Sequence, residues 1–438
     1  MTQIDASADA LYRKIALRIV PFLFICYVVN FIDRVNIGFA KLQFLDDLGL
    51  DDAAFGVAAG MFFIGYVIFE IPSNLMLGRI GARKTLMRIM VLWGGFTVLL
   101  AFVQTATWLY VLRFLLGAAE AGFFPGIVLY LTYWFPSRRR GRVMSLFIMA
   151  VPIAGIIGGP VSGAIMSHFQ HVAGLRGWQW LFVAEGVPAI ALGLLALVCL
   201  KDAPHLAAWL NTDERARLAA DLQADHAADS ASKIKHLRDL LRSPRLYLMA
   251  AIYFTIFAFL NAIGFWIPTV LKSVGAHSVA QIGWLAGAIA TAAAIGVLVV
   301  GYHSDRTMER RWHVAGCGFA SAAAFLLLPL AAHDVGFSAV LLGAASIGIY
   351  SVLSIFWTIP TAYLQGDAAA GGIAFITAVG AIGGAMSPSI VGLLKTHTGS
   401  LYMGLSAIAV LLVVGMLALL WFVPANLVPA NLKAARLR

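Results

Sequence analysis

Charged residues are scarce in this chain. Lysine and arginine number 31 and aspartate and glutamate 21, so only 12% of the 438 residues are charged. A soluble domain carries about 25% charged residues. The hydrophobic fraction is 61% and the mean hydropathy is +0.87, which excludes an ordinary soluble protein. This composition is typical of a protein that crosses a membrane many times.

Cysteine and enzymatic motifs are also missing or few. Cys26, Cys199 and Cys317 all lie in apolar stretches, and no CxxC pair is present. We expect them to be small buried hydrophobic side chains rather than disulfides or metal ligands. The chain has no HExxH, no GxSxG and no two clustered histidines on one helix. Nothing therefore supports a membrane-embedded enzyme, and we expect no cofactor and no metal site.

Apolar runs of about 20 residues, the length that spans a bilayer, recur along the chain. Six lie on each side of one long polar segment. We predict an all-α integral membrane protein of twelve transmembrane helices in two six-helix halves, 1–200 and 246–438, joined by a cytoplasmic loop at 201–245. The expected spans are 17–38, 53–77, 85–103, 108–134, 142–167, 178–200, 246–271, 279–302, 313–332, 338–362, 368–394 and 399–423.

The distribution of basic residues predicts the orientation. They gather at both ends of the chain and in every second connection, while the intervening connections hold about one each or none. The connection after span 10 departs from this alternation, because it has Asp367 and no basic residue. By the positive-inside rule both termini lie in the cytoplasm. The net charge of +10 therefore indicates membrane topology and not a nucleic-acid surface. No cleavage site follows residues 1–14, so the first apolar run is expected to be a retained helix.

Four charged residues lie well inside spans 1 and 4 of the first half. Asp33 and Arg34 are adjacent in span 1, and Arg113 and Glu120 are seven residues apart in span 4. A charge at the centre of a membrane helix costs roughly 2.5–3.5 kcal/mol, so such residues are rare and usually functional. They predict a hydrated, ion-handling interior, and hence a protein that moves a solute across the membrane.

The spacing of these residues suggests proton coupling. Asp33 and Arg34 are about 100° apart on a helix, so one can face the interior while the other faces a neighbouring helix. Burial favours a neutral carboxyl group and a nearby arginine favours the charged form, so a carboxyl group under both influences can exchange a proton near neutral pH. We predict that Asp33, Glu120 and Arg113 couple transport to protons. A static ion pair of Asp33 with Arg113 is the alternative.

Arg34 suits the carboxylate of a substrate. A guanidinium group stays charged and can bind both oxygens of a carboxylate. We also expect Arg34 to neutralise the adjacent Asp33. Spans 7–12 have no charged residue at membrane depth, so the second half is expected to contact the uncharged body of the substrate. Its candidate residues, for each of which helix packing is the alternative, are Asn261, Trp266, Tyr350, Ser354, Trp357 and Thr377.

The connections after spans 2 and 8 are similar in sequence. Segment 301–311 reads GYHSDRTMERR and segment 74–84 reads NLMLGRIGARK. Both begin with a small residue and three variable residues, followed by an aspartate, an arginine and further basic residues. Segment 74–84 differs in having Gly78 in place of the aspartate. This form resembles the signature loop of the major facilitator superfamily; ordinary positive-inside charge is the alternative. The resemblance implies gating roles at one membrane face for Asp305, Arg306, Arg79 and, near the end of span 2, Glu70.

Longer motifs resemble one branch of that superfamily, the anion:cation symporter family. The first is FIDRVNIGFA at 31–40. The branch includes transporters of sugar acids, tartrate and phthalate. Further matches in the expected order are EIPSN at 70–74, GAAEAGFFPG at 117–126, GWQWLFVAEG at 177–186 and FWTIPT at 356–361.

This resemblance implies a monomeric secondary transporter of the bacterial inner membrane that imports a small organic carboxylate together with protons. It implies a substrate site formed by Arg34, Tyr66, Ser354, Trp357 and Thr377, although Tyr66 could also be a packing residue. Family members often have asparagines on the eleventh helix, where this chain has Thr377 and Ala381. The particular substrate is therefore not transferred. A facilitator or antiporter that uses the same charges for gating is the alternative, and a transport-derived sensor would need an output domain that this sequence lacks.

Overall fold

Helices are the regular secondary structure of the described part of the computed structural model, which covers residues 3–231, 243–307, 309–360 and 367–423. Eleven helical segments in this part are long and apolar enough to cross a membrane. A twelfth crossing segment is α3 (Ala82–Leu100), which falls outside that group because its first two turns carry Arg83, Lys84 and Arg88. The predicted twelve-span, all-α fold is confirmed.

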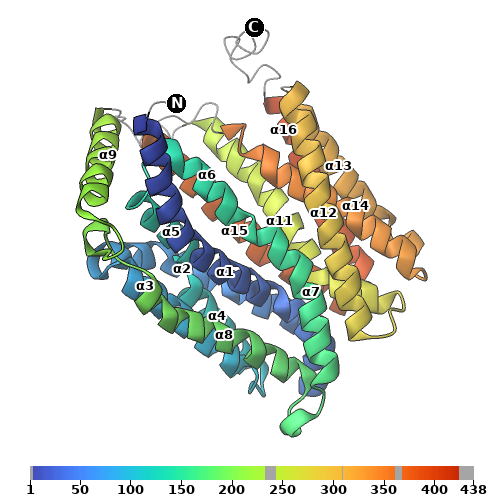
Figure 1. Cartoon of the computed structure of the whole chain (residues 1–438). Coiled ribbons are helices and arrows are strands. Elements are labelled where there is room, and N and C mark those ends of the chain that lie inside the picture. The colour runs from blue at the N-terminus through green and yellow to red at the C-terminus, as the bar shows by residue number, and fades with distance from the viewer. Residues whose placement is uncertain (1–2, 232–242, 308, 361–366, 424–438) are drawn as a thin grey trace.

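The two halves lie side by side in Figure 1. The first half contains α1 (Gln3–Leu48), α2 (Asp52–Ile80), α3, α4 (Ala106–Glu120), α5 (Phe123–Thr132), α6 (Ser137–Ile148), α7 (Ala150–His168) and α8 (Gly177–Cys199). The second half contains α11 (Pro244–Ser273), α12 (Val279–Thr307), α13 (Arg311–Leu327), α14 (Val335–Phe356), α15 (Asp367–Thr398) and α16 (Leu401–Phe422). The other elements are α9 (Thr212–Ala231) and the short helices Val172–Gly174, Pro204–Leu206 and Leu328–Ala331.

Large apolar side chains cover the outside of the bundle. Leu298 is 74% exposed, Leu330 76% and Trp421 84%. In water such a surface would associate, whereas in a bilayer the acyl chains solvate it. Backbone polar groups are satisfied inside the helices, as a hydrocarbon environment requires. The exterior therefore agrees with a multi-pass membrane protein.

One face of the bundle carries the start of α1, α9 and the connections α2–α3 and α12–α13; we call it the α9 face (Figure 1). The opposite face, which carries the connections α1–α2 and α15–α16, is called the far face. Helix α1 has 46 residues, about 69 Å at 1.5 Å per residue, and so exceeds the expected span 17–38. It extends beyond this range at both ends, and near its start Tyr12 and Lys14 bond to α9. The predicted end of span 10 at 362 and the C-terminal tail lie outside the described residues.

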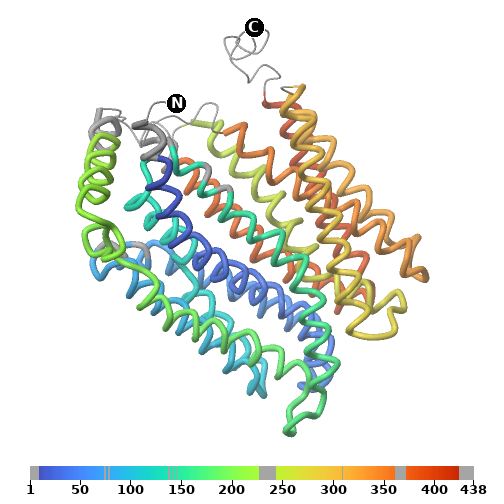
Figure 2. Tube along the Cα trace, in the orientation of Figure 1, coloured from blue at the N-terminus to red at the C-terminus, as the bar shows by residue number. Residues whose placement is uncertain are grey.

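Side-chain bonds attach α9 to α1. The Tyr12 hydroxyl donates to Asp221 Oδ2 at 2.7 Å, and Lys14 Nζ donates to Glu214 at 2.8 Å. The central loop therefore returns onto the first helix. In Figure 2 the green helix α9 lies beside the blue N-terminal part of α1, at the edge of the bundle.

Acidification should release this attachment. The hydrogen bonds from Lys14 lower the pKa of Glu214. A lowered carboxyl pKa contributes stability above the unfolded value of about 4.3, and that contribution is lost as pH falls through the folded value. Glu214→Gln should have the same effect at neutral pH. Because a surface pair contributes about 1 kcal/mol or less, cleavage by trypsin at Arg215 and Arg217 should accelerate by at most several-fold. Equal cleavage of Glu214→Gln and the control Asp213→Asn would contradict this prediction.

The halves are packed tightly at the far face. Ser389 Oγ on α15 donates to the carbonyl oxygen of Gly56 on α2 at 2.9 Å. On the other side of the interface, α7 meets α12 where Gly159 faces Gly283. A Cβ atom at either glycine would collide with the backbone of the opposite helix. The two halves are therefore in backbone contact at this face.

Candidate functional site

The fourth membrane segment is broken beside a buried acid. Helix α4 ends at Glu120, Gly122 adopts φ = 85°, and the chain resumes as α5 at Phe123. A glycine is suited to this left-handed conformation because it has no Cβ atom. Discontinuous membrane helices are typical of solute-binding sites in transporters, where their free ends face polar groups. Glu120, which is fully buried, lies at the C-terminal end of such a half-helix.

The tenth segment, α14, ends at Phe356, and Trp357, Thr358 and Ile359 form a turn before Pro360. A break inside a membrane segment is described for the fourth segment. That break is therefore the structural pointer to the candidate site.

Arg34 and Glu120 form an ion pair. Arg34 Nε donates to Glu120 Oε1 at 3.1 Å, and Nη2 of the same arginine bonds to the same oxygen. The Arg34 side chain keeps 23% of its surface exposed, while Glu120 has 1%. The rings of Phe31, Phe62 and Tyr66 lie 5.4–5.6 Å from the guanidinium carbon. Arg34 is thus a partly accessible cation whose present partner is an acid of the protein.

Asp33 points to another part of the bundle. Its Oδ2 atom accepts from the Trp93 indole at 2.7 Å and from the Thr97 hydroxyl at 3.0 Å, both on α3. Asn36 Nδ2 donates to its Oδ1 atom at 3.1 Å. The expectation that Arg34 neutralises Asp33 was wrong, because adjacent residues on a helix point in different directions and Arg34 reaches Glu120 instead.

Arg113 is buried and weakly bonded. Its Nε atom donates to the carbonyl oxygen of Ala58 at 3.4 Å, and its guanidinium carbon lies 4.9 Å from the Phe62 ring centre. Within the described part of the chain its two Nη atoms have no hydrogen-bond partner, nor does Glu120 Oε2. Arg113 is close enough to interact electrostatically with Asp33 and Glu120. The static Asp33–Arg113 pair that we considered is not formed here.

Two glycines bring α2 against α4 at this site. A Cβ atom on Gly117 would collide with the carbonyl oxygen of Phe62, and one on Gly65 would collide with that of Phe114. This close approach lets Phe62 and Tyr66 on α2 pack beside Arg34 and Arg113. The position of the aromatic side chains around the two arginines depends on it.

Gly117→Ala should therefore disturb both the fold and transport. Overpacking costs typically about 1–3 kcal/mol, which outweighs the better helix propensity of alanine. We expect a lower melting temperature in detergent and a loss of most transport activity. Gly95→Ala on α3 is the matched control, because an added Cβ would meet no neighbouring atom within 4 Å. Melting temperatures that respond equally to the two substitutions would contradict this prediction.

The predicted residues of the second half lie on α11, α14 and α15 or, for Trp357, directly after α14. Ser354 and Thr377 are exposed, although both lie in membrane-crossing segments. The Thr377 hydroxyl donates to Ile373 and Ala374 of its own helix at 2.9 Å. Trp357 packs on Tyr253, with ring centres 4.9 Å apart. A substrate role for these residues, and for Tyr66, stays a prediction.

The predicted gating residues lie toward the α9 face. Asp305 forms an ion pair with Arg310 at 2.6 Å, within the same connection. Arg306 and Arg79 are exposed, and Glu70 is half-buried on α2. The gating roles stay predictions.

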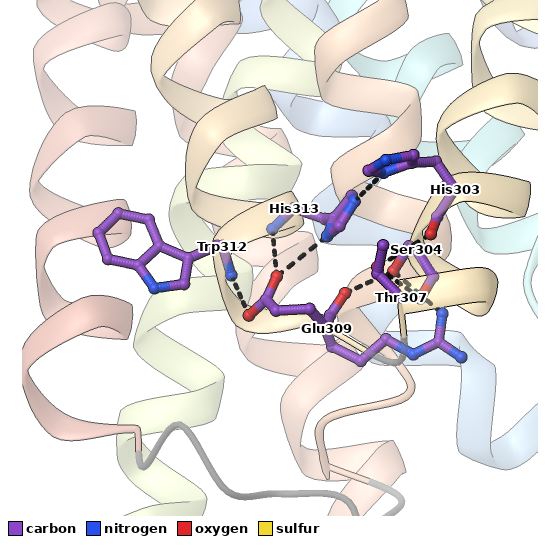
Figure 3. A network of polar contacts seen from close by, with 7 residues as sticks. His303, Ser304, Thr307, Glu309, Trp312 and His313 are labelled. Carbon is purple, nitrogen blue, oxygen red and sulfur yellow. Dashed lines mark hydrogen bonds and ion pairs between the residues drawn. The ribbon is translucent and has the colours of Figure 1, made fainter. Parts of the chain in front are cut away.

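A polar network ties the α12–α13 connection together (Figure 3). His303 Nδ1 lies 2.7 Å from His313 Nε2, and His313 Nδ1 lies 3.0 Å from Glu309 Oε2. Glu309 also accepts from the backbone nitrogens of Trp312 and His313 at the start of α13. Ser304 donates to the Glu309 carbonyl oxygen at 2.8 Å. The described residues on both sides of the α12–α13 connection are therefore bonded to one another.

A charged cluster joins the halves at the far face. Lys395 Nζ on α15 lies 2.5 Å from Asp52 Oδ2, and Lys41 Nζ on α1 lies 3.7 Å from Asp52 Oδ1. Lys41 is buried, with its ammonium 3.3 Å from the centre of the Trp266 ring on α11. Lys272 on α11 also donates to the Leu42 carbonyl oxygen on α1 at 2.8 Å.

The sequence analysis predicted neither this cluster nor the hydrogen bond from Asn36 to Asp33. Lys41, Lys272 and Lys395 were visible as the sparse basic residues of the poorly charged connections, but nothing in the sequence indicates that two of them meet one aspartate. In the part of the chain that the structure describes, no group of three or more His, Cys, Asp or Glu side chains is suited to a metal ion.

A model of the Major Facilitator Superfamily matches residues 23–277, which is more than half of the chain. The chain belongs to the Major Facilitator Superfamily. Its resemblance to this superfamily, noted in the sequence, is confirmed, and its members are transporters and not enzymes.

Relatives of known name agree with this assignment. A Pseudomonas putida protein provisionally named metabolite transport protein NicT is 43% identical over 399 residues, covering 91% of each chain. An Agrobacterium vitis protein provisionally named a tartrate transporter is 44% identical over 411 residues, covering 93% of each. The partially occluded inward-open structure of the Escherichia coli xylose transporter XylE superimposes with a TM-score of 0.75 at 14% identity, covering 94% of this chain and 99% of that one. The last similarity concerns the fold alone.

Proposed function

We propose that this superfamily member is a secondary active transporter that imports a small organic carboxylate together with protons. The proposal is based on the ion pair of Arg34 with Glu120 at the break between α4 and α5. Arg34 is the more accessible partner, and its guanidinium group has the geometry to bind a carboxylate. The names of the tartrate and metabolite transporters support an organic anion as substrate.

Competition for Arg34 provides the coupling. Both a substrate carboxylate and Glu120 need the same guanidinium group. When Glu120 takes up a proton it loses its charge and releases Arg34, which can then bind the substrate anion. The incoming proton and anion leave the net charge of the site unchanged, which avoids the cost of an added charge inside the membrane. Arg113, whose Nη atoms lack partners among the described residues, is available to stabilise the acids during this exchange.

The second half completes the substrate site in this proposal. Trp357 offers a flat apolar surface and Ser354 a hydroxyl group, and Thr377 lies on α15. The body of the substrate would lie between these side chains and Tyr66. Thr377 and Ala381 provide fewer hydrogen bonds than asparagines would, which favours a less polar acid.

Alternating access then requires two gates. We place the α9 face in the cytoplasm of a bacterial cell and the far face outside the inner membrane, as the basic residues predict. The structure described here would be closed to the outside by the Lys41–Asp52–Lys395 cluster and the glycine contacts. Asp305, Arg306, Arg79 and Glu70 would close the cytoplasmic face in the opposite state. The protein would act as a monomer in the lipid bilayer.

Proteoliposome transport tests this proposal. Purified protein is first screened for thermal stabilisation by a panel of carboxylates that includes tartrate. The best acid is then offered to proteoliposomes with and without an imposed inward pH gradient. Uphill accumulation only with the gradient is expected. Equilibration without accumulation would indicate a facilitator, and accumulation driven by an outward pH gradient or a counter-anion would indicate an antiporter.

A further inference from the structure

Glu185 on α8 is a buried acid that the proposed cycle does not yet use. It is 6% exposed. Its Oε2 atom accepts from Asn36 Nδ2 at 2.5 Å, and its Oε1 atom accepts from the Ser162 hydroxyl on α7 at 3.2 Å. Both donors are uncharged. Among the described residues no lysine, arginine or histidine lies within ion-pair distance of Glu185.

Asn36 joins Glu185 to Asp33. The same Nδ2 atom that donates to Glu185 also lies 3.1 Å from Asp33 Oδ1. An amide nitrogen has two hydrogens, so it can donate one to each carboxyl group. The remaining Asp33 oxygen is bound by Trp93 and Thr97. Two acids on different helices therefore share one donor nitrogen in the interior of the first half.

The charges around this pair do not balance if both acids are ionised. The charged group that faces Glu185 from α1 is Asp33; α7 contributes Ser162, and α3 contributes the Trp93 and Thr97 groups that bind Asp33. Arg34 is taken by Glu120, and Arg113 bonds neither Asp33 nor Glu185 among the described contacts. Two carboxylates at this separation, away from water, repel each other, and such pairs are stabilised by sharing one proton.

We propose that Glu185 is a second proton-binding residue of the transport cycle, holding with Asp33, across Asn36, a proton that crosses the membrane with the substrate. This proposal rests on the proposed proton-coupled function. The proton bonds to a carboxyl oxygen of the pair when the site faces outside and is released to water on the cytoplasmic side. Asp33, Arg34 and Asn36 lie within one turn of α1, so a shift of α1 on substrate binding moves the groups at both proton sites.

The number of protons carried per substrate tests this assignment. Proteoliposomes are held at zero membrane potential, and the steady-state accumulation of radiolabelled tartrate is measured against the imposed pH difference. If tartrate is not carried, the panel acid with the highest counterflow replaces it. The slope of the logarithm of the accumulation ratio against the pH difference equals the number of coupled protons. Glu185→Gln should lower this slope by one, so accumulation at a difference of one pH unit falls about tenfold.

Two other variants separate proton binding from a structural role. Glu185→Asp keeps a titrating group and should keep the wild-type slope. Ser162→Ala removes one hydrogen bond of Glu185 but no proton site, and should also keep it. A wild-type slope in Glu185→Gln would overturn the assignment of Glu185 alone, whereas a zero slope in the wild-type protein would overturn the proposed symport itself.

A spectroscopic measurement decides the question if Glu185→Gln does not fold. Infrared difference spectra recorded on addition of the same acid should contain the carbonyl stretch of a protonated carboxyl group. This band should shift in frequency in Glu185→Asp. A spectrum that is identical in the wild-type protein and Glu185→Asp would contradict the proposal.

Discussion

Glu120→Gln should remove one coupled proton from the uphill accumulation of substrate while exchange of substrate across the membrane continues. The amide cannot release or take up a proton, so Arg34 is free of its acid partner throughout the cycle. The carrier then changes conformation without a proton at this position, and only the proton of the Asp33–Glu185 pair still couples the substrate to the pH gradient. At an imposed difference of one pH unit we expect accumulation to fall about tenfold. Counterflow of preloaded substrate should persist.

The control for this variant is an acid away from the site. Asp213→Asn changes an exposed residue of α9 and should keep proton-driven accumulation. Asp33→Asn should also impair accumulation, because Asp33 belongs to the second carboxyl pair. Accumulation that is unchanged in both Glu120→Gln and Asp33→Asn would remove these acids from the coupling mechanism.

Arg34→Lys should weaken substrate binding although the positive charge is kept. A lysine ammonium cannot make the two parallel hydrogen bonds that a guanidinium group offers to a carboxylate. A hydrogen bond to a charged group contributes about 1.5–3 kcal/mol, so affinity should fall by about tenfold or more. Calorimetric titration of the purified variant with the transported acid measures this change.

Arg83→Lys provides the comparison for Arg34→Lys. Arg83 on α3 also lies beside an acid, with its Nε atom 4.0 Å from Asp202, but at the α9 face and outside the proposed site. The Arg83→Lys protein should bind the transported acid with wild-type affinity. If Arg34→Lys also does so, Arg34 is not a substrate ligand.

Hydropathy was sufficient to predict the twelve segments, because lipid requires every crossing helix to be apolar over a fixed length. It was less informative about the ends of the helices. Helix α1 extends beyond the predicted span at both ends, and the bonds of Tyr12 and Lys14 to α9 join residues about 200 positions apart. The helix break after Glu120 was not predicted either, although Gly122 and Pro125 mark it in the sequence.

The charged residues of the candidate site could be recognised in the sequence, but the contacts between them could be predicted only in part. Charges at membrane depth are costly, so Asp33, Arg34, Arg113 and Glu120 were recognisable without a structure. Which acid binds which arginine depends on the rotation and separation of α1 and α4, and these are decided by packing. The α2–α4 approach at Gly117 is one such determinant.

Neutral residues give weaker sequence signals than charged ones. Asn36 lies three residues after Asp33, and its amide could have bonded to its own helix or to a neighbour. Only the relative position of α1 and α8 shows that it bridges Asp33 and Glu185. The far-face cluster was equally hidden, because Lys41, Asp52 and Lys395 come from both halves of the chain.

Proton uptake on substrate binding tests the central claim most directly. Purified protein in a weakly buffered solution near neutral pH is mixed with the fully ionised salt of the transported acid, and the proton change is followed with an indicator dye. Because the substrate must displace Glu120 from Arg34, the wild-type protein should take up about one proton more per bound substrate molecule than Glu120→Gln does. Glu120→Gln should bind the acid without this additional proton. Substrate binding to the wild-type protein with no proton uptake, or with the same uptake as in Glu120→Gln, would contradict the account.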